Sequence, residues 1–381
     1  MKKKFINLIV AVITVCIFFT SLANVSFAKS VNCPDKKADK LANYVAKATD
    51  NVNIAKSFNE TSNSLSISEG SLSYNISKDS NQPITTTLES GETIEMSLPE
   101  ELSLEKGVES KCASVMYIGS NNASFCTQIL EEPVCEDKTY SNRNSIIIEN
   151  SKATHQYTFN FNLPSGYILS AAAEYNEKQL EYYRNSKNKL LRSGLSENEF
   201  DNIISQFDIN SKEVYVINEE NEIVEIIESP WAKDSNGNDI ETNYKIEDNK
   251  IIQNVDFDEN SSFPIIADPT AHPTNYKYFS LKKASVKTLR DKYATSTRAT
   301  ILGYISSVAL TKFSILSVGL ASVSFANNLY AVEKHKLWTK VYDGFKGKRN
   351  MVKIRVAYTW NDLHRAYAPS RTVKVVSYYK K

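Results

Sequence analysis

The sequence lacks the short motifs that mark several kinds of enzyme. It contains no Gly-x-Ser-x-Gly turn of a serine hydrolase, no His-Glu-x-x-His zinc site and no Gly-x-x-x-x-Gly-Lys phosphate loop. Histidine is also scarce, with 4 residues in a chain of 381. Because nothing else supports those reactions, we predict no catalytic residue, no cofactor and no metal ion.

Acidic residues are almost missing from the last part of the chain. From Tyr276 to Lys381 there are 4 Asp+Glu against 21 Lys+Arg, a net charge of +17, whereas the whole chain carries only +1. A dense field of one sign attracts partners of the opposite sign. We therefore predict that this region binds anionic envelope polymers or a membrane surface, with nucleic acid a weaker alternative.

The first residues have the pattern of a secretory signal peptide. Lys2, Lys3 and Lys4 precede an apolar run over residues 5–22, and Ser26 and Ala28 supply the small residues of a cleavage site. We predict a signal peptide over residues 1–28 and a secreted protein, either extracellular or associated with the cell wall. An uncleaved membrane anchor is the alternative, because the run is long enough to span a bilayer.

Secretion would place the cysteines in an oxidising compartment, in which disulfides form. The chain after residue 28 keeps Cys33, Cys112, Cys126 and Cys135. An even number of cysteines in an oxidising compartment predicts two disulfides, and the sequence leaves all three pairings open. Four independent thiols are the alternative.

Residues 29–270 read as an acidic, β-rich module. Apolar residues alternate with polar ones at period two, as in Leu65 and Ile67 or in Tyr157 and Phe159, which is typical of half-buried antiparallel strands. A helical insert over about 175–207 interrupts this pattern. There, a run rich in Glu, Lys and Leu ends at Gly194, and Ser196 with Glu199 forms a capping box for a second helix.

The end of this module carries the one family resemblance. Pro230-Trp231-Ala232-Lys233-Asp234, a turn at Gly237 and Phe263-Pro264-Ile265-Ile266-Ala267-Asp268-Pro269-Thr270 lie within residues 229–270. This segment resembles one shared by uncharacterised secreted proteins of Gram-positive bacteria. The resemblance implies a fold unit and an extracellular life, and no activity. Trp231 reads as a core residue, and the Asp/Asn residues after it read as a turn rather than a calcium loop, since Gly237 is not at the position an EF-hand requires.

The basic region is expected to begin after a linker at 271–279, at a boundary marked by Pro264, Pro269 and Pro273. Ser280 can cap an amphipathic helix, an apolar stretch follows over 299–332, and the tail alternates like antiparallel strands at 337–342, 351–360 and 372–379. The apolar stretch is a buried hairpin or core helix, a segment that inserts into a target membrane, or a permanent anchor. The predicted anion-binding residues are Lys282, Lys283, Lys287, Arg290, Lys340, Lys353, Arg355 and Lys374.

Together these observations predict an α+β protein. An acidic antiparallel module with a helical insert (29–270) precedes a small basic C-terminal domain (280–381) of helices followed by a short sheet. We expect noncatalytic binding to an anionic envelope, with an antibacterial, membrane-perturbing role and masking of the basic surface by the acidic module. The alternatives are a small nuclease-like toxin domain, in which His335 and His364 would act as acid and base, and a structural cell-surface protein.

Overall fold

The computed structural model describes residues 36–49, 54–110, 114–134, 137–192, 197–205, 207–295, 338–362 and 365–381. The described residues belong to one compact unit, Asp35–Lys381. The expected signal peptide and the apolar stretch 299–332 lie outside the described residues. Among the residues that are described, no helix has the length and apolar character needed to cross a membrane.

The described part of the chain is strand-rich, with antiparallel sheets and few helices, as an α+β class requires. One sheet has eight strands in the order β1-β2-β3-β4-β5-β10-β16-β15. Its strands are β1 (Asn59–Glu60), β2 (Ser64–Glu69), β3 (Leu72–Ser77), β4 (Ile84–Thr87), β5 (Thr93–Met96), β10 (Gln156–Asn162), β15 (Thr242–Glu247) and β16 (Lys250–Val255).

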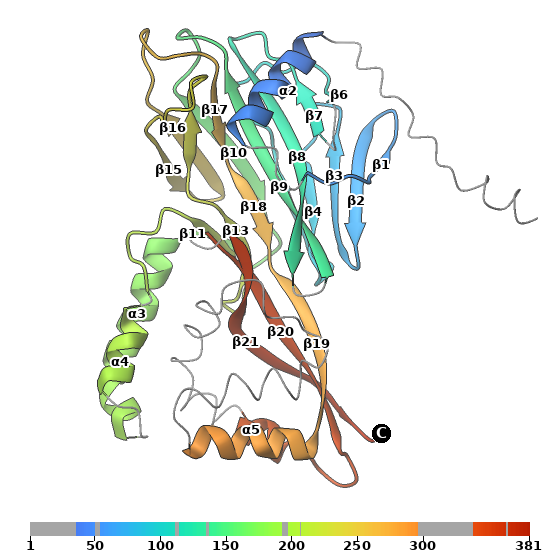
Figure 1. Cartoon of the computed structure of the whole chain (residues 1–381), viewed down its shortest axis with the longest axis vertical. Helices are drawn as coiled ribbons and strands as arrows, with labels where there is room; N and C mark the ends of the chain where they lie inside the picture. Colours follow the sequence, from blue (N-terminus) through green and yellow to red (C-terminus); the bar gives the residue numbers. More distant parts are fainter. Residues whose placement is uncertain are drawn as a thin grey trace, which may run out of the picture. The chain divides into compact units, whose positions relative to one another are not determined.

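A second sheet has ten strands, eight of them in the order β11-β12-β13-β18-β9-β8-β7-β6, with β17 pairing β9 and β14. Its strands are β6 (Val108–Ser110), β7 (Ser114–Tyr117), β8 (Ala123–Val134), β9 (Asp137–Ile148), β11 (Ile168–Ala171), β12 (Val214–Ile217), β13 (Ile223–Ile227), β14 (Trp231–Lys233), β17 (Ile265–Asp268) and β18 (Thr270–Pro273). The long strands β8 and β9 are its centre (Figure 1).

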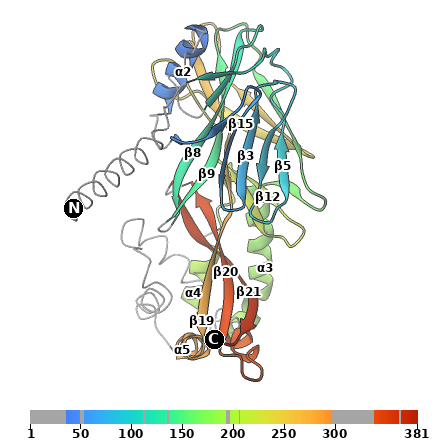
Figure 2. The same cartoon turned by 90° about the vertical axis from the view of Figure 1, so that its right-hand side faces the viewer.

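These two sheets pack face to face around one apolar core (Figure 2). The first sheet contributes Tyr74 and Phe159, and the second contributes Phe125 and Ile146, all essentially inaccessible to solvent. The period-two alternation explains this arrangement, because it places every second side chain on the inner face of its sheet.

One helix covers the outer face of the second sheet, and two others follow its strand β11 along the chain. α2 (Lys36–Ala48) places Leu41 and Val45 against Met116 and Ile147 on the outer face of that sheet. α3 (Ala172–Arg192) follows β11, and α4 (Glu197–Ile204) follows α3. α3 and α4 cover the range predicted for the helical insert.

A third, three-stranded sheet has the order β19-β20-β21. Its strands are β19 (Asn275–Lys282), β20 (Met351–Asn361) and β21 (Ala366–Tyr379), which lie side by side in Figure 1. α5 (Lys283–Thr295) and a helical turn at 338–343 pack on one face of this sheet. Val286 and Val341 meet Leu281, Val352 and Ile354 there to form a small second core.

The predicted linker at 271–279 is wrong, because β18 and β19 occupy it. Thr274 alone separates them, and it is 3% exposed. Its backbone N–H donates to the Val224 carbonyl at 2.7 Å and its hydroxyl donates to the Ile223 carbonyl at 2.8 Å. Pro273 lies at the end of a strand, where a missing N–H is tolerated. The prolines therefore end strands here and do not mark a hinge.

Two finer predictions about the basic region are also wrong. Ser280 does not cap a helix, because β19 continues through it to Lys282 and α5 starts at Lys283. The strand expected at 337–342 is helical over 338–343 in the described residues. In both cases pairing with β20 decides the outcome: β19 takes the place beside β20 that the 337–342 strand was expected to fill.

Candidate functional site

The eight predicted anion-binding residues fall into three groups. Lys282, Lys287 and Lys340 are exposed. Lys283 and Arg290 lie over the Tyr342 ring at 5.2 and 4.3 Å from its centroid, and Arg290 also pairs with Asp291. The remaining three are on the open face of the third sheet: Lys353, Arg355 and Lys374.

The open face of the third sheet alternates aromatic and cationic side chains. The Arg355 guanidinium lies 4.2 Å from the Tyr276 ring centroid, and the Lys353 Nζ lies 4.8 Å from that of Tyr278. The strand register explains the pairing, since Tyr278, Arg355 and Lys374 are direct neighbours across β19, β20 and β21. Lys353, Arg355 and Lys374, three of the predicted anion-binding residues, thus share one face of this sheet.

Part of this cationic face is already paired with acidic residues of the preceding sheets. The β12–β13 turn brings Glu222 to 3.4 Å from an Arg355 Nη and 2.9 Å from the Lys374 Nζ, and Glu220 also contacts Lys374. The side chain of Glu222 is only 10% exposed. On the other face of β19, where Lys277 lies opposite Val356, Lys277 pairs with Asp137 at 2.9 Å. The acidic part of the chain therefore neutralises one end of the cationic face.

The opposite end of this sheet gathers cations without acidic partners. Asn350 is its centre, because its carbonyl accepts from Lys283 N–H at 2.8 Å and its side-chain oxygen accepts from Lys381 N–H at 3.0 Å. We call the surrounding exposed residues the cationic end. They are Lys282, Lys346, Lys348, Arg349, Lys380 and Lys381. Within the described residues none of these six side chains forms an ion pair.

Five residues of the cationic end were not among the predicted site residues. The sequence does show a turn rich in lysine and glycine at 343–350, but it does not show that Lys282 and the C-terminal lysines lie beside that turn. Gly344 holds the turn close to β21, because a Cβ there would collide with the Tyr378 hydroxyl. That hydroxyl donates to the Val341 carbonyl at 2.8 Å.

Cys126 is a free, buried thiol, so the disulfide predicted at this position is wrong. The residue lies on β8 and packs beside Met116 and Ile147 beneath α2. Burial raises the pKa of this thiol to about 12, which keeps it protonated and unreactive. Cys33, Cys112 and Cys135 lie outside the described residues.

One buried group of polar and aromatic side chains, around His272, was not predicted from the sequence. His272 on β18 is 1% exposed, and its Nδ1 lies 2.7 Å from the Ser141 hydroxyl oxygen while its Nε2 lies 2.9 Å from a Glu228 carboxylate oxygen. Trp360 from β20 stacks on the imidazole, with centroids 3.8 Å apart and planes 3° from parallel. Tyr367 from β21 donates its hydroxyl to the Pro273 carbonyl at 3.0 Å.

This Ser-His-Glu chain resembles a hydrolase triad only in its order of contacts. Ser141 is 0% exposed, and it lies on a strand whose backbone pairs with β8 on one side and with β18 on the other. No substrate reaches the hydroxyl, and the ladder uses the N–H groups that an oxyanion hole would need. The arrangement is therefore a buried structural network, which we call the buried polar seam. Its members are Ser141, Arg143, Glu225, Glu228, Asp268, His272, Trp360 and Tyr367.

Carboxyl groups outnumber cations in the buried polar seam. Burial raises the pKa of Glu225 to about 8. Burial also raises the pKa of Asp268 to about 7, although Arg143, whose Nε is 3.3 Å away, lowers it. For Glu228, burial also raises the pKa, but the hydrogen bond with His272 and the charges of His272, Arg365 and Arg143 together outweigh it and hold the pKa below its ordinary value. Burial lowers the pKa of His272.

Of the other histidines, His155 stacks on Phe257 at 4.0 Å and binds the Val255 carbonyl. His335 and His364, on which the nuclease alternative depends, lie outside the described residues. Asp234 accepts backbone N–H groups from Asn236 and Asn238 at 2.9 and 2.8 Å, as expected for a turn. No group of three His, Cys, Asp or Glu side chains in the described residues could hold a metal ion.

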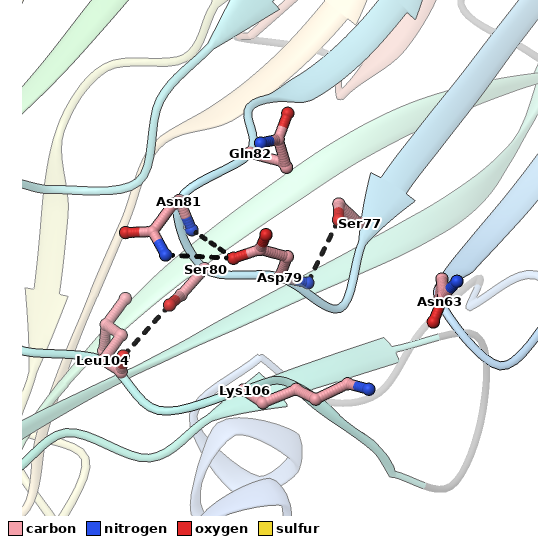
Figure 3. Close-up of a pocket in the computed structure, with 8 residues that line it drawn as sticks. All are labelled: Asn63, Ser77, Asp79, Ser80, Asn81, Gln82, Leu104 and Lys106. Atoms are coloured by element: carbon pink, nitrogen blue, oxygen red, sulfur yellow. Dashed lines mark hydrogen bonds between the residues drawn. The ribbon is translucent and has the colours of Figure 1, made fainter.

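A polar cavity of about 690 Å³ lies beside the β3–β4 turn (Figure 3). Several of its residues bond one another: Asp79 accepts from the Asn81 backbone and amide at 3.0 and 3.1 Å, and Ser80 donates to the Leu104 carbonyl. These contacts hold the turn in place. The lining residues are Asn63, Ser77, Asp79, Ser80, Asn81, Gln82, Leu104 and Lys106.

Comparison of the chain with protein-family models, curated proteins and solved structures found no match. The resemblance of residues 229–270 to secreted Gram-positive proteins stays a prediction. In the structure the two ends of this segment pair with each other, since β14 lies antiparallel to β17 with Trp231 opposite Asp268. The quoted residues thus meet in one piece of the second sheet.

Proposed function

We propose that this protein is a noncatalytic binder of the anionic cell envelope and that it binds through the cationic end. The observation that carries the proposal is the cluster of six exposed Lys and Arg side chains without ion pairs around Asn350. Asp343 is the one acidic residue in the stretch 338–350. A compact, exposed cluster of one sign attracts phosphate-rich polymers and lipid headgroups.

We propose the cell envelope as the target because the sequence predicts a signal peptide. A secreted protein meets wall polymers and anionic lipid surfaces, and each juxtamembrane Lys or Arg adds about 1 kcal/mol of attraction to an anionic membrane. The basic C-terminal domain, with its helices and sheet, is the binding part in this proposal, and an antibacterial role would follow from the same attraction.

Masking, in this proposal, is local. Glu220 and Glu222 pair with Arg355 and Lys374 at one end of the cationic face. The cationic end, by contrast, needs no release before it meets a ligand. The function therefore does not depend on separation of the acidic module from the basic sheet.

Replacing Lys346, Lys348 and Arg349 together with glutamine should weaken binding to vesicles of anionic phospholipid about 100-fold. Three cations at about 1 kcal/mol each account for that loss. Co-sedimentation of the secreted full chain with these vesicles measures it. All three residues are exposed, so the variant should fold as the wild type does.

A matched variant controls for net charge. Lys106, Lys152 and Lys212 are exposed lysines in the acidic module, and replacing them with glutamine removes the same charge. The proposal expects little change in vesicle binding from this control. Equal losses in the two variants would show that overall charge, and not the cationic end, governs binding.

A further inference from the structure

The third sheet contacts the second sheet at the buried polar seam. We call this contact the joint. Trp360 and Tyr367 come from the hairpin formed by β20 and β21, and they pack against Val134, Tyr215 and Ile226 of the second sheet. Their polar contacts fall on two adjacent residues of β18: Trp360 stacks on His272 and Tyr367 donates to Pro273. The hairpin end thus makes its ring-stacking and hydrogen-bond contacts with β18 and its apolar contacts with β8, β12 and β13.

Glu225 lies directly beside that attachment. In the antiparallel register it is opposite Pro273, and its neighbour Ile226 is opposite His272. It is 2% exposed, and one of its carboxyl oxygens has no hydrogen-bond partner in the described residues. An ionised carboxylate at such a site would lack both water and a counter-charge.

The charged and titratable groups around the joint come from every element packed there. In the second sheet they are Glu132 on β8, Arg143 on β9, Glu225 on β13, Glu228 just after β13, Asp268 on β17 and His272 on β18. The hairpin adds Asp362, Arg365 and Tyr367. Tyr74, Glu213 and Tyr215 lie at the margin. The carboxyl groups outnumber the cations in this set.

We propose that the joint is a pH-sensitive latch: the hairpin end carrying Trp360 and Tyr367 is held most firmly in mildly acidic solution and opens as Glu225 ionises. The latch concerns how the third sheet is attached and is independent of what the cationic end binds. Opening would expose the acidic seam next to Arg355 and Lys374, and it would loosen the local masking described above.

The direction of the pH dependence follows from the pKa shifts of two buried groups, the Glu225 carboxyl and the His272 imidazole. Burial raises the pKa of Glu225 from 4.5 to about 8, so its contribution to closure is complete below the lower value and is lost as the pH rises toward the upper one. Burial lowers the pKa of His272, so its contribution is lost as the pH falls below the ordinary imidazole range. The latch is therefore tightest in mildly acidic solution, above the pH range in which His272 gains a proton and below that in which Glu225 ionises.

Hydrogen exchange of the full chain tests this. Between about pH 6 and about pH 8, with exchange rates corrected for intrinsic chemistry, the opening equilibrium of peptides covering 357–361 and 366–368 should rise about 100-fold, since one carboxyl changes it about tenfold per pH unit. Peptides from the central strands β8 and β9 should show no such rise. Glu225→Gln should remove most of the rise, because glutamine keeps the shape of the protonated acid and only the smaller contribution of Asp268, whose pKa burial raises to about 7, remains.

Glu109→Gln is the matched control. Burial raises the pKa of Glu109 to about 7. Glu109 lies on β6, at the end of the second sheet away from the seam, and pairs there with Lys78. This variant should keep the wild-type rise. If Glu225→Gln fails to fold, Glu225→Ala provides a second uncharged side chain. The latch is wrong if wild-type protection is the same at both pH values, if the Glu225 variants keep the full rise, or if β8 and β9 lose protection in parallel.

Discussion

Replacing Trp360 with alanine should lower the free energy of unfolding by about 3–5 kcal/mol, the usual cost of deleting a fully buried tryptophan side chain. Trp360 is 5% exposed, and its indole lies flat on His272 while its edge meets Tyr367 5.5 Å away. Because a whole domain is stabilised by only about 5–15 kcal/mol, this loss is a large share of the total. Urea unfolding followed by far-UV circular dichroism measures it.

Trp231→Ala is the comparison. Trp231 is half-buried and packs at the margin of the cluster under α2, so its loss should cost clearly less. Trp360→Phe should retain much of the packing. A cost below about 1 kcal/mol for Trp360→Ala would mean that the third sheet is attached without help from the seam.

Replacing Arg143 with methionine should cost about 3–5 kcal/mol at about pH 8, because it leaves Asp268 as an uncompensated buried charge. The side chains of Arg143 and Asp268 are 7% and 1% exposed. The pKa of Asp268 sets how this cost changes with pH. Burial raises the pKa of Asp268 to about 7 from its ordinary 3.8, so the carboxyl protonates as the pH falls and the cost should shrink in mildly acidic solution.

The double variant Arg143→Met with Asp268→Asn separates charge from packing. Removing both partners should restore most of the stability lost in the single variant, since no buried charge then remains. The exposed pair Lys178 and Glu174 provides the control: Lys178→Met should cost no more than about 0.5 kcal/mol. A double variant as unstable as Arg143→Met alone would contradict the electrostatic explanation.

The sequence pattern predicted the elements whose signals are local. Alternation at period two located Leu65 and Ile67 on β2 and Tyr157 and Phe159 on β10, and all four are buried. The composition of 175–207 indicated α3 and α4. These signals need only the neighbours along the chain, which explains their success.

What failed depends on strand pairing, which is not local. Pro273 predicts a linker until β13 is known to lie beside it, and Cys126 predicts a disulfide until its side chain is known to face α2. The buried polar seam joins residues far apart in the chain, such as Ser141 and His272, which are 131 positions apart. The cationic end is similar, because the register of β19 and β21 on β20 brings Lys282 and Lys381 beside Asn350.

Salt dependence of vesicle binding tests the proposed function most directly. The full chain is titrated with vesicles of anionic phospholipid and with neutral vesicles over rising salt concentration, in which exposed charges are screened beyond about 10 Å at 0.1 M. Binding through the cationic end predicts strong binding to anionic vesicles at low salt, a steep loss as salt rises, and no binding to neutral vesicles. Equal binding to both kinds of vesicle, or binding that salt leaves unchanged, would contradict it.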